Sequence, residues 1–100
     1  MEKDKRNELI NLYDIYNSLL TDKQRLYFEE YYYNDLSLSE ISENYDISRN
    51  AVFDQLNKVE KLLIFYEEKL HLKEKYDNLL KVTNDKEILD KIEDILWGDD

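Results

Sequence analysis

The chain has no cysteine, no proline, one glycine and one histidine among its 100 residues. Without cysteine it can form neither a disulfide nor a thiolate zinc site, and it has no cysteine nucleophile. A single histidine, His71, excludes metal sites that need two of them. The scarcity of glycine and proline argues against a turn-rich β-protein and excludes a glycine-rich phosphate loop. We therefore predict no catalytic, cofactor-binding or metal-binding residues and expect a protein that is not an enzyme.

Long apolar runs are also missing. No stretch approaches the roughly 20 apolar residues of a membrane span, and residues 1–8 lack the apolar core of a signal peptide. We expect a cytoplasmic protein without a membrane partner.

Positive charge is scarce, because 14 basic residues face 24 acidic ones and give a formal net charge of −10. The excess is spread evenly, with a net charge of −5 over residues 1–66 and again over 67–100. Nucleic-acid binders usually show the opposite balance, since neutralised phosphates drive their affinity. Charge therefore disfavours DNA as a partner.

What the chain does contain is helical periodicity, which predicts an all-α fold. Apolar residues at helical spacing indicate a first helix over about 5–20 and a second over about 22–34. Two capping-box patterns, Thr21 with Gln24 and Ser37 with Glu40, predict helix starts at 22 and at 38. The helix that follows Ser37 is short, about 38–45.

A fourth helix is expected to begin at Arg49, with Ser48 as its N-cap. Its apolar residues are spaced 3, 4, 3 and 4 apart, as in a coiled coil, and we treat them as a dimerisation seam: Leu56, Val59, Leu63, Tyr66 and Leu70. The same stripe could instead be the spine on which the other helices fold, but we favour a homodimer. This helix either runs unbroken to about residue 81 or kinks near Leu70.

The C-terminal part is expected to hold one more helix. A break falls at 82–85, where Asn84 followed by Glu87 resembles another cap. The last helix is expected to end at Gly98 and to be docked by Trp97. His71 is interpreted as a solvated surface residue.

The most informative segment is 38–61, in which two helices are joined by a tight turn, as in a helix-turn-helix. Asp46 stands at the turn position that glycine often takes, and aspartate tolerates left-handed backbone geometry. The second helix of the pair is the candidate recognition helix, with these site residues: Ser48, Arg49, Asn50, Phe53, Gln55, Asn57 and Lys58. Phe53 and Asp54 stand where a DNA-reading helix is usually polar or basic.

Consecutive tyrosines, Tyr31 to Tyr33, mark the second helix. Successive helical residues turn by about 100°, so at least one of these rings must be exposed. We interpret the run as amphipathic packing rather than as a platform for RNA bases.

Residues 20–63, which include L-T-D-K-Q-R and S-R-N-A-V-F-D-Q, resemble region 4 of bacterial sigma-70-type factors. They are more similar to the small YlxM-type helix-turn-helix proteins of Gram-positive bacteria, and that likeness includes F-Y-E-E-K-L-H-L-K-E-K-Y (65–76). The resemblance implies a helix-turn-helix bundle over residues 1–63 and a helical extension over 64–100. Genes of that family commonly lie beside those of the signal recognition particle GTPase or its receptor.

By resemblance, the expected function is that of an accessory or regulatory protein of co-translational targeting. Its expected partners are the particle GTPase, the receptor or the particle RNA. The alternative is a DNA-binding transcriptional regulator that uses the helix at 49–61 through Arg49, Asn50, Phe53 and Gln55, with Asn50 and Gln55 pairing with adenine and Arg49 with guanine or a phosphate.

Overall fold

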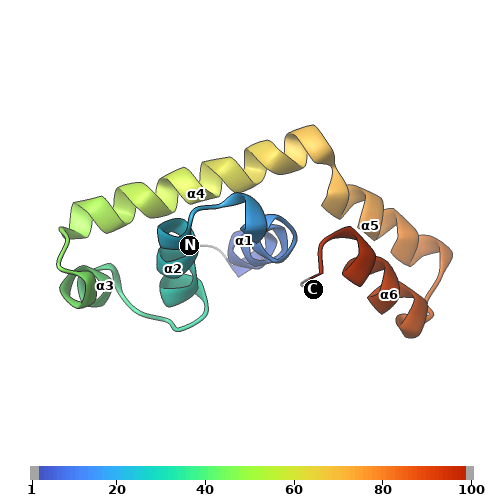
Figure 1. Cartoon of the computed structure of the whole chain (residues 1–100), viewed down its shortest axis with the longest axis horizontal. Helices are drawn as coiled ribbons and strands as arrows, with labels where there is room; N and C mark the ends of the chain where they lie inside the picture. Colours follow the sequence, from blue (N-terminus) through green and yellow to red (C-terminus); the bar gives the residue numbers. More distant parts are fainter. Residues whose placement is uncertain (1–2, 99–100) are drawn as a thin grey trace.

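The computed structural model describes residues 3–98, and these fold into helices without strands. The elements are α1 (Lys3–Tyr16), the 3-10 helix η1 (Asn17–Leu19), α2 (Asp22–Tyr32), α3 (Leu38–Tyr45), α4 (Arg49–Leu70), α5 (Leu72–Val82) and α6 (Lys86–Leu96). The predicted all-α fold is confirmed. In Figure 1 the long helix α4 runs along one side, with α1, α2 and α3 beneath it; α5 continues at an angle beyond its far end, and α6 turns back beside α5. None of the described helices is long and apolar enough to cross a membrane.

Local capping sets the start of three helices. Thr21 and Gln24 form one complete capping box, and Ser37 and Glu40 form another, each with both reciprocal hydrogen bonds. The Ser48 hydroxyl accepts from the Ala51 N–H at 3.0 Å and caps α4. These side chains satisfy N–H groups that have no partner within the helix, so the predicted starts at 22, 38 and 49 are confirmed.

The predicted ends are less accurate. The α-helix α1 stops at Tyr16 rather than at 20, and η1 follows it. The reason is local, because the Asn17 amide donates to the carbonyls of Tyr13 and Asp14 at 3.0 and 3.1 Å. Helix α2 ends at Tyr32 rather than at 34, and the turn beyond it passes through Asp35 with φ of 56°.

Helix α4 ends at Leu70, which confirms the kinked alternative. His71 is exposed, as predicted, and it also occupies the left-handed region at φ of 55°, where the chain bends from α4 into α5 (Figure 1). At the next break the proposed cap by Asn84 is wrong. Asp85 is the N-cap, and its carboxylate accepts from the Glu87 and Ile88 amides.

The last helix ends at Leu96, two residues before Gly98. Gly98 does not have a positive φ. Its lack of a side chain matters because an added Cβ would lie 2.6 Å from the Asp94 Cα. Trp97 docks the helix as predicted, with its ring 5.4 Å from that of Tyr76 and against the main core.

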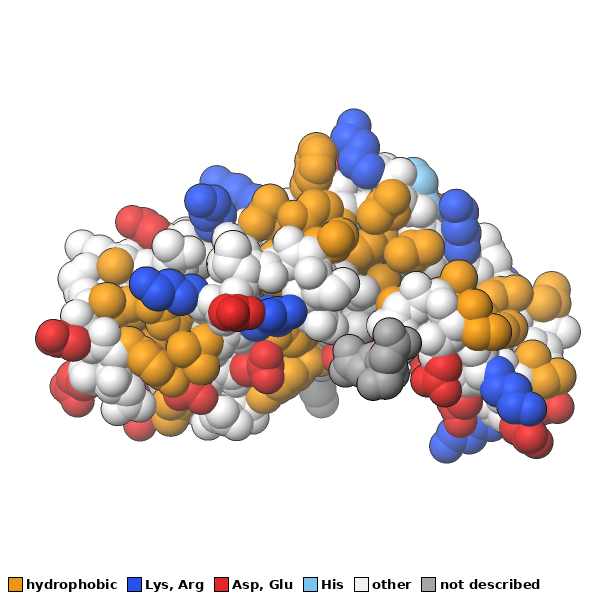
Figure 2. All heavy atoms as spheres, viewed as in Figure 1, with side chains coloured by type: hydrophobic (Ala, Val, Ile, Leu, Met, Phe, Trp, Pro, Cys, Tyr) orange, Lys and Arg blue, Asp and Glu red, His pale blue; other side chains and the backbone are white. Residues whose placement is uncertain are grey.

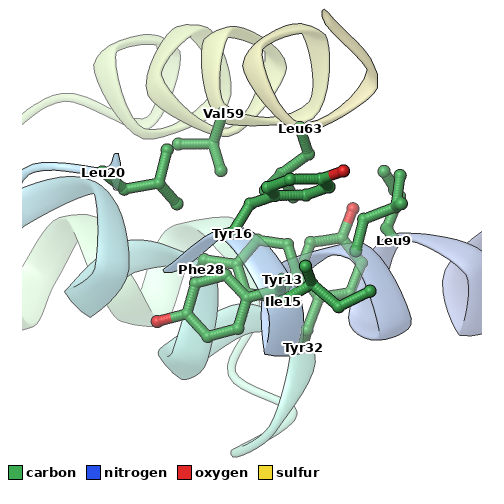
Figure 3. Close-up of a cluster of buried hydrophobic side chains, with 10 residues drawn as sticks. Leu9, Tyr13, Ile15, Tyr16, Leu20, Phe28, Tyr32, Val59 and Leu63 are labelled. Atoms are coloured by element: carbon green, nitrogen blue, oxygen red, sulfur yellow. The ribbon is translucent and has the colours of Figure 1, made fainter. Parts of the chain in front are cut away.

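The main core lies where α1, α2 and α4 meet (Figure 3). Tyr16 and Phe28 are its largest fully buried side chains, and the Tyr13 ring stacks on Phe28 at 4.2 Å. Within the tyrosine run, Tyr32 is buried and Tyr33 is exposed, as the helical period requires. A second cluster, of Tyr27, Ile41, Val52 and Leu56, joins α3 to α2 and α4.

The apolar stripe of α4 is the internal spine of this bundle. Leu56, Val59 and Leu63 are buried against α1, α2 and α3 of the same chain. Tyr66 is half-buried against the main core, and Leu70 is exposed. The stripe is therefore not free to act as the predicted dimer seam, because its central residues already have partners within the chain. A homodimer stays a prediction and would need another surface.

Helix α4 also passes without interruption through residue 63, where the two expected parts of the chain meet. The division into 1–63 and 64–100 stays a prediction.

Candidate partner-binding face of the helix-turn-helix

The turn between α3 and α4 holds the two helices in a fixed relation. Asp46 lies in the left-handed region at φ 53° and ψ 48°, the geometry expected where glycine is common. The Asp46 N–H donates to the Ser42 carbonyl, and the Ile47 N–H donates to the same oxygen at 3.1 Å. The chain thus leaves α3 and enters α4 within three residues.

Side-chain packing beneath the turn holds α3 and α4 against the rest of the bundle. Ile41 and Val52 have no exposed surface, and Leu36 and Ile47 pack against the cluster that they form. The Tyr45 hydroxyl donates to Glu30 at 3.2 Å, which ties the end of α3 to α2. These contacts fix the angle between α3 and α4, as a helix-turn-helix requires.

Four of the predicted recognition residues share one face of α4. Arg49, Asn50, Phe53 and Asn57 are exposed and lie within about 100° of one another around the helix axis, at 100° per residue. Phe53, at 51% exposure, stands in their middle. We call these four residues the Phe53 face.

The other predicted recognition residues do not belong to this face. Gln55 is half-buried and lies about 160° around the helix from Phe53. Lys58 is exposed but about 140° away. Ser48 is occupied as the N-cap of α4. One partner surface cannot contact all seven residues at once.

Phe53 lines two hollows in the surface. The first, of about 260 Å³, is lined by Leu38, Arg49, Asn50 and Phe53. The second, of about 100 Å³, is lined by these residues: Tyr31, Tyr32, Leu38, Phe53, Leu56, Asn57 and Glu60. The two hollows share Leu38 and Phe53 and are lined by residues of α4, the start of α3 and the end of α2, and we call them together the Phe53 groove.

The walls of this groove include residues that were not predicted from the sequence. Leu38 and Tyr31 come from helices that precede α4, and both are half-buried. No pattern in the sequence places them beside Phe53, since their position depends on how α2 and α3 pack on α4.

Charge around the groove is sparse. Among residues 3–98, no ion pair or hydrogen bond is found for the Arg49 guanidinium at one end. At the other end, Glu60 is neutralised by Lys5, with Nζ and Oε1 2.7 Å apart. Burial and the nearby Glu60 carboxylate raise the pKa of Tyr32 to about 12, so this hydroxyl stays neutral at physiological pH.

Basic groups elsewhere on α4 do not extend this face into a positive strip. Lys58 and Lys61 are exposed on the outward side of the helix, where Asp54 lies one turn before Lys58. Figure 2 shows Lys and Arg side chains at intervals along the edge that α4 and α5 form; acidic side chains are more frequent on the lower side, where Lys and Arg side chains also lie among them.

The fold and this face define an all-α protein of the helix-turn-helix class. The chain belongs to the UPF0122 family, whose model, described as "Putative helix-turn-helix protein, YlxM / p13 like", matches residues 3–97. The resemblance seen in the sequence is therefore confirmed.

Relatives in the same family match most of the chain. A UPF0122 protein of Lactococcus lactis is 42% identical over 103 residues, which cover 95% of this chain and 93% of that protein. One from Mycoplasma capricolum is 42% identical over 102 residues, covering 94% and 90% of the two chains. One from Caldanaerobacter subterraneus is 59% identical over 70 residues, covering 70% and 60%.

Proposed function

We propose that this protein is a non-enzymatic accessory protein of the signal recognition particle pathway. It acts in the cytoplasm and binds a protein or ribonucleoprotein partner, for which the particle GTPase, its receptor and the particle RNA are the candidates. The pathway is proposed from the YlxM-type resemblance, and the mode of action is proposed from the Phe53 groove.

The observation that carries the proposal is the half-exposed ring of Phe53 in the second turn of the recognition helix, where it lines two adjoining hollows. Most base readout is by hydrogen-bonding side chains, with apolar contacts confined to the thymine methyl, and phosphate contacts come mainly from cationic side chains. An exposed aromatic ring beside a hollow with mainly apolar walls, such as the one lined by Leu38, Leu56 and Tyr31, is typical of the anchors that dominate protein interfaces. The net charge of −10 further favours a partner with basic surfaces.

The test is a titration of the full chain with the purified particle GTPase, with its receptor and with the particle RNA, while GTP turnover is followed. Phe53→Ala should weaken binding about tenfold or more, the loss typical of a central aromatic anchor. Phe65→Ala is the matched control, because Phe65 is 50% exposed on the same helix but points away from the groove. Its affinity should stay within about twofold of wild type. Absence of binding to all three partners would refute the proposal.

The second candidate is a DNA-binding regulator, which the exposed Arg49, Lys58 and Lys61 favour. For this function, affinity for duplex DNA must fall steeply with salt and must be lost in Arg49→Ala. A mobility-shift titration at 50 and 200 mM salt separates the two candidates, because a Phe53-anchored protein contact depends far less on salt.

A further inference from the structure

The shape of the Phe53 groove determines what kind of chain segment can occupy it. From Arg49 to Glu60 it follows α4 for eleven residues, or about 16 Å at 1.5 Å per residue. Three turns of a partner helix cover the same length.

The lining of the groove favours a helix over an extended peptide. Its walls are mostly the apolar or aromatic side chains of Leu38, Phe53, Leu56 and Tyr31, with the amides of Asn50 and Asn57 at the margin. An extended segment would bury backbone N–H and C=O groups that such walls cannot satisfy. A helix satisfies its own backbone and presents only side chains, as in other helix-in-groove complexes.

The charged residues at the ends of the groove determine which sign of charge the partner needs. Glu60 is compensated by Lys5, whereas Arg49 has no anionic partner among residues 3–98. Covering the Phe53 face without an opposing anion would strip water from the Arg49 guanidinium at a cost. A carboxylate can pair with this guanidinium through two parallel hydrogen bonds.

We infer that the Phe53 groove binds an amphipathic helix whose apolar face packs around Phe53 and whose Asp or Glu side chain pairs with Arg49. This inference rests on the proposed function, because it names the segment of the protein partner that the same face would contact.

Two synthetic helical peptides provide the probe. Both are 15 residues long with leucine at every third or fourth position, and they differ only by Glu or Lys at the first turn of the apolar edge. Each is titrated into the full-length ¹⁵N-labelled protein, and binding is followed by shifts of the backbone amides. The Glu peptide should bind at least five times more tightly than the Lys peptide, with shifts centred on the amides of Leu38, Asn50 and Phe53.

Two variants and one control variant make the result specific. Phe53→Ala should abolish the shifts, whereas the control Phe65→Ala should retain them. Arg49→Glu should reverse the preference, so that the Lys peptide binds more tightly. Equal binding of both peptides to wild type, or shifts that avoid the groove, would overturn the inference.

Failure of the inference can be told from failure of the proposed function. If the GTPase or its receptor binds in a Phe53-dependent way while neither peptide binds, the inference is wrong and the function stands. If the Glu peptide binds in the groove while the GTPase, the receptor and the RNA all fail to bind, the inference stands and the pathway is wrong.

Discussion

Removing the hydroxyl group of Tyr16 should weaken the contact between α1 and the turn that joins α4 to α5. The ring of Tyr16 is buried at 1% exposure. Its hydroxyl donates to Glu67 Oε1 at 2.6 Å and accepts from the Leu72 N–H at 3.1 Å. The same carboxylate accepts from the Lys73 and Glu74 amides at 3.0 and 3.1 Å, so it caps the start of α5. The hydroxyl therefore connects α1 directly to the turn between α4 and α5.

The cost of Tyr16→Phe follows from these contacts. The phenyl ring remains, so no cavity forms and the packing against Tyr66 is kept. The lost hydrogen bond to an ionised carboxylate contributes about 1.5–3 kcal/mol. Leu72 is half-buried, so water can replace part of the bond from its amide. We expect the free energy of unfolding to fall by about 2 kcal/mol and Tm by about 10 °C.

The assay is urea unfolding followed by circular dichroism, together with amide hydrogen exchange at residues 72–74. The matched control is Tyr33→Phe, which removes a hydroxyl that donates to Asp14 at 2.9 Å on the exposed surface. The control should lose less than about 1 kcal/mol, since water competes for exposed pairs. Stability of Tyr16→Phe within 0.5 kcal/mol of wild type, with unchanged exchange at 72–74, would refute the assigned role of this hydroxyl.

Three further outcomes are expected. Burial raises the pKa of Tyr16 to about 12 and that of Tyr32 to about 12, above the ordinary value near 10. The folded state therefore holds these protons more tightly than the unfolded state does. The free energy of unfolding should keep its full value below pH 10 and fall between pH 10 and 12 by about 1.4 kcal/mol per pH unit for each group. Urea unfolding at pH 9 and at pH 11 measures this loss. Leu63→Ala should cost about 2–5 kcal/mol because the side chain is fully buried, whereas Leu70→Ala should cost less than about 1; equal costs in thermal unfolding would contradict the internal-spine role of α4. Asp85→Ala should cost about 1 kcal/mol and speed amide exchange in the first turn of α6, and unchanged exchange there would contradict its role as the cap.

The candidate site was partly accessible from the sequence. Phe53 and its neighbours Arg49 and Asn50 are predictable, because an N-cap at Ser48 sets the helical register that follows. That register also separates Gln55 and Lys58 from Phe53, so the helical period alone could have divided the predicted set. The apolar walls at Leu38 and Tyr31 could not be assigned, since they reach Phe53 only through the packing of three helices.

Composition and local hydrogen bonding determined the class of this protein. The scarcity of glycine and proline indicates helices, and three polar side chains, Thr21, Ser37 and Ser48, start helices through contacts within a few residues. Such signals are visible in the sequence because both partners lie in the same short segment.

Tertiary structure decided where α4 ends and what its apolar stripe contacts. The end at Leu70 is supported by contacts across more than 50 residues, from Tyr16 to Glu67 and Leu72. The apolar stripe from Leu56 to Leu63 could be buried equally well against a second chain or against α1 and α2, because the hydrophobic effect is not directional. Only the folded arrangement shows that the stripe is used inside the chain and that Phe53 stays exposed.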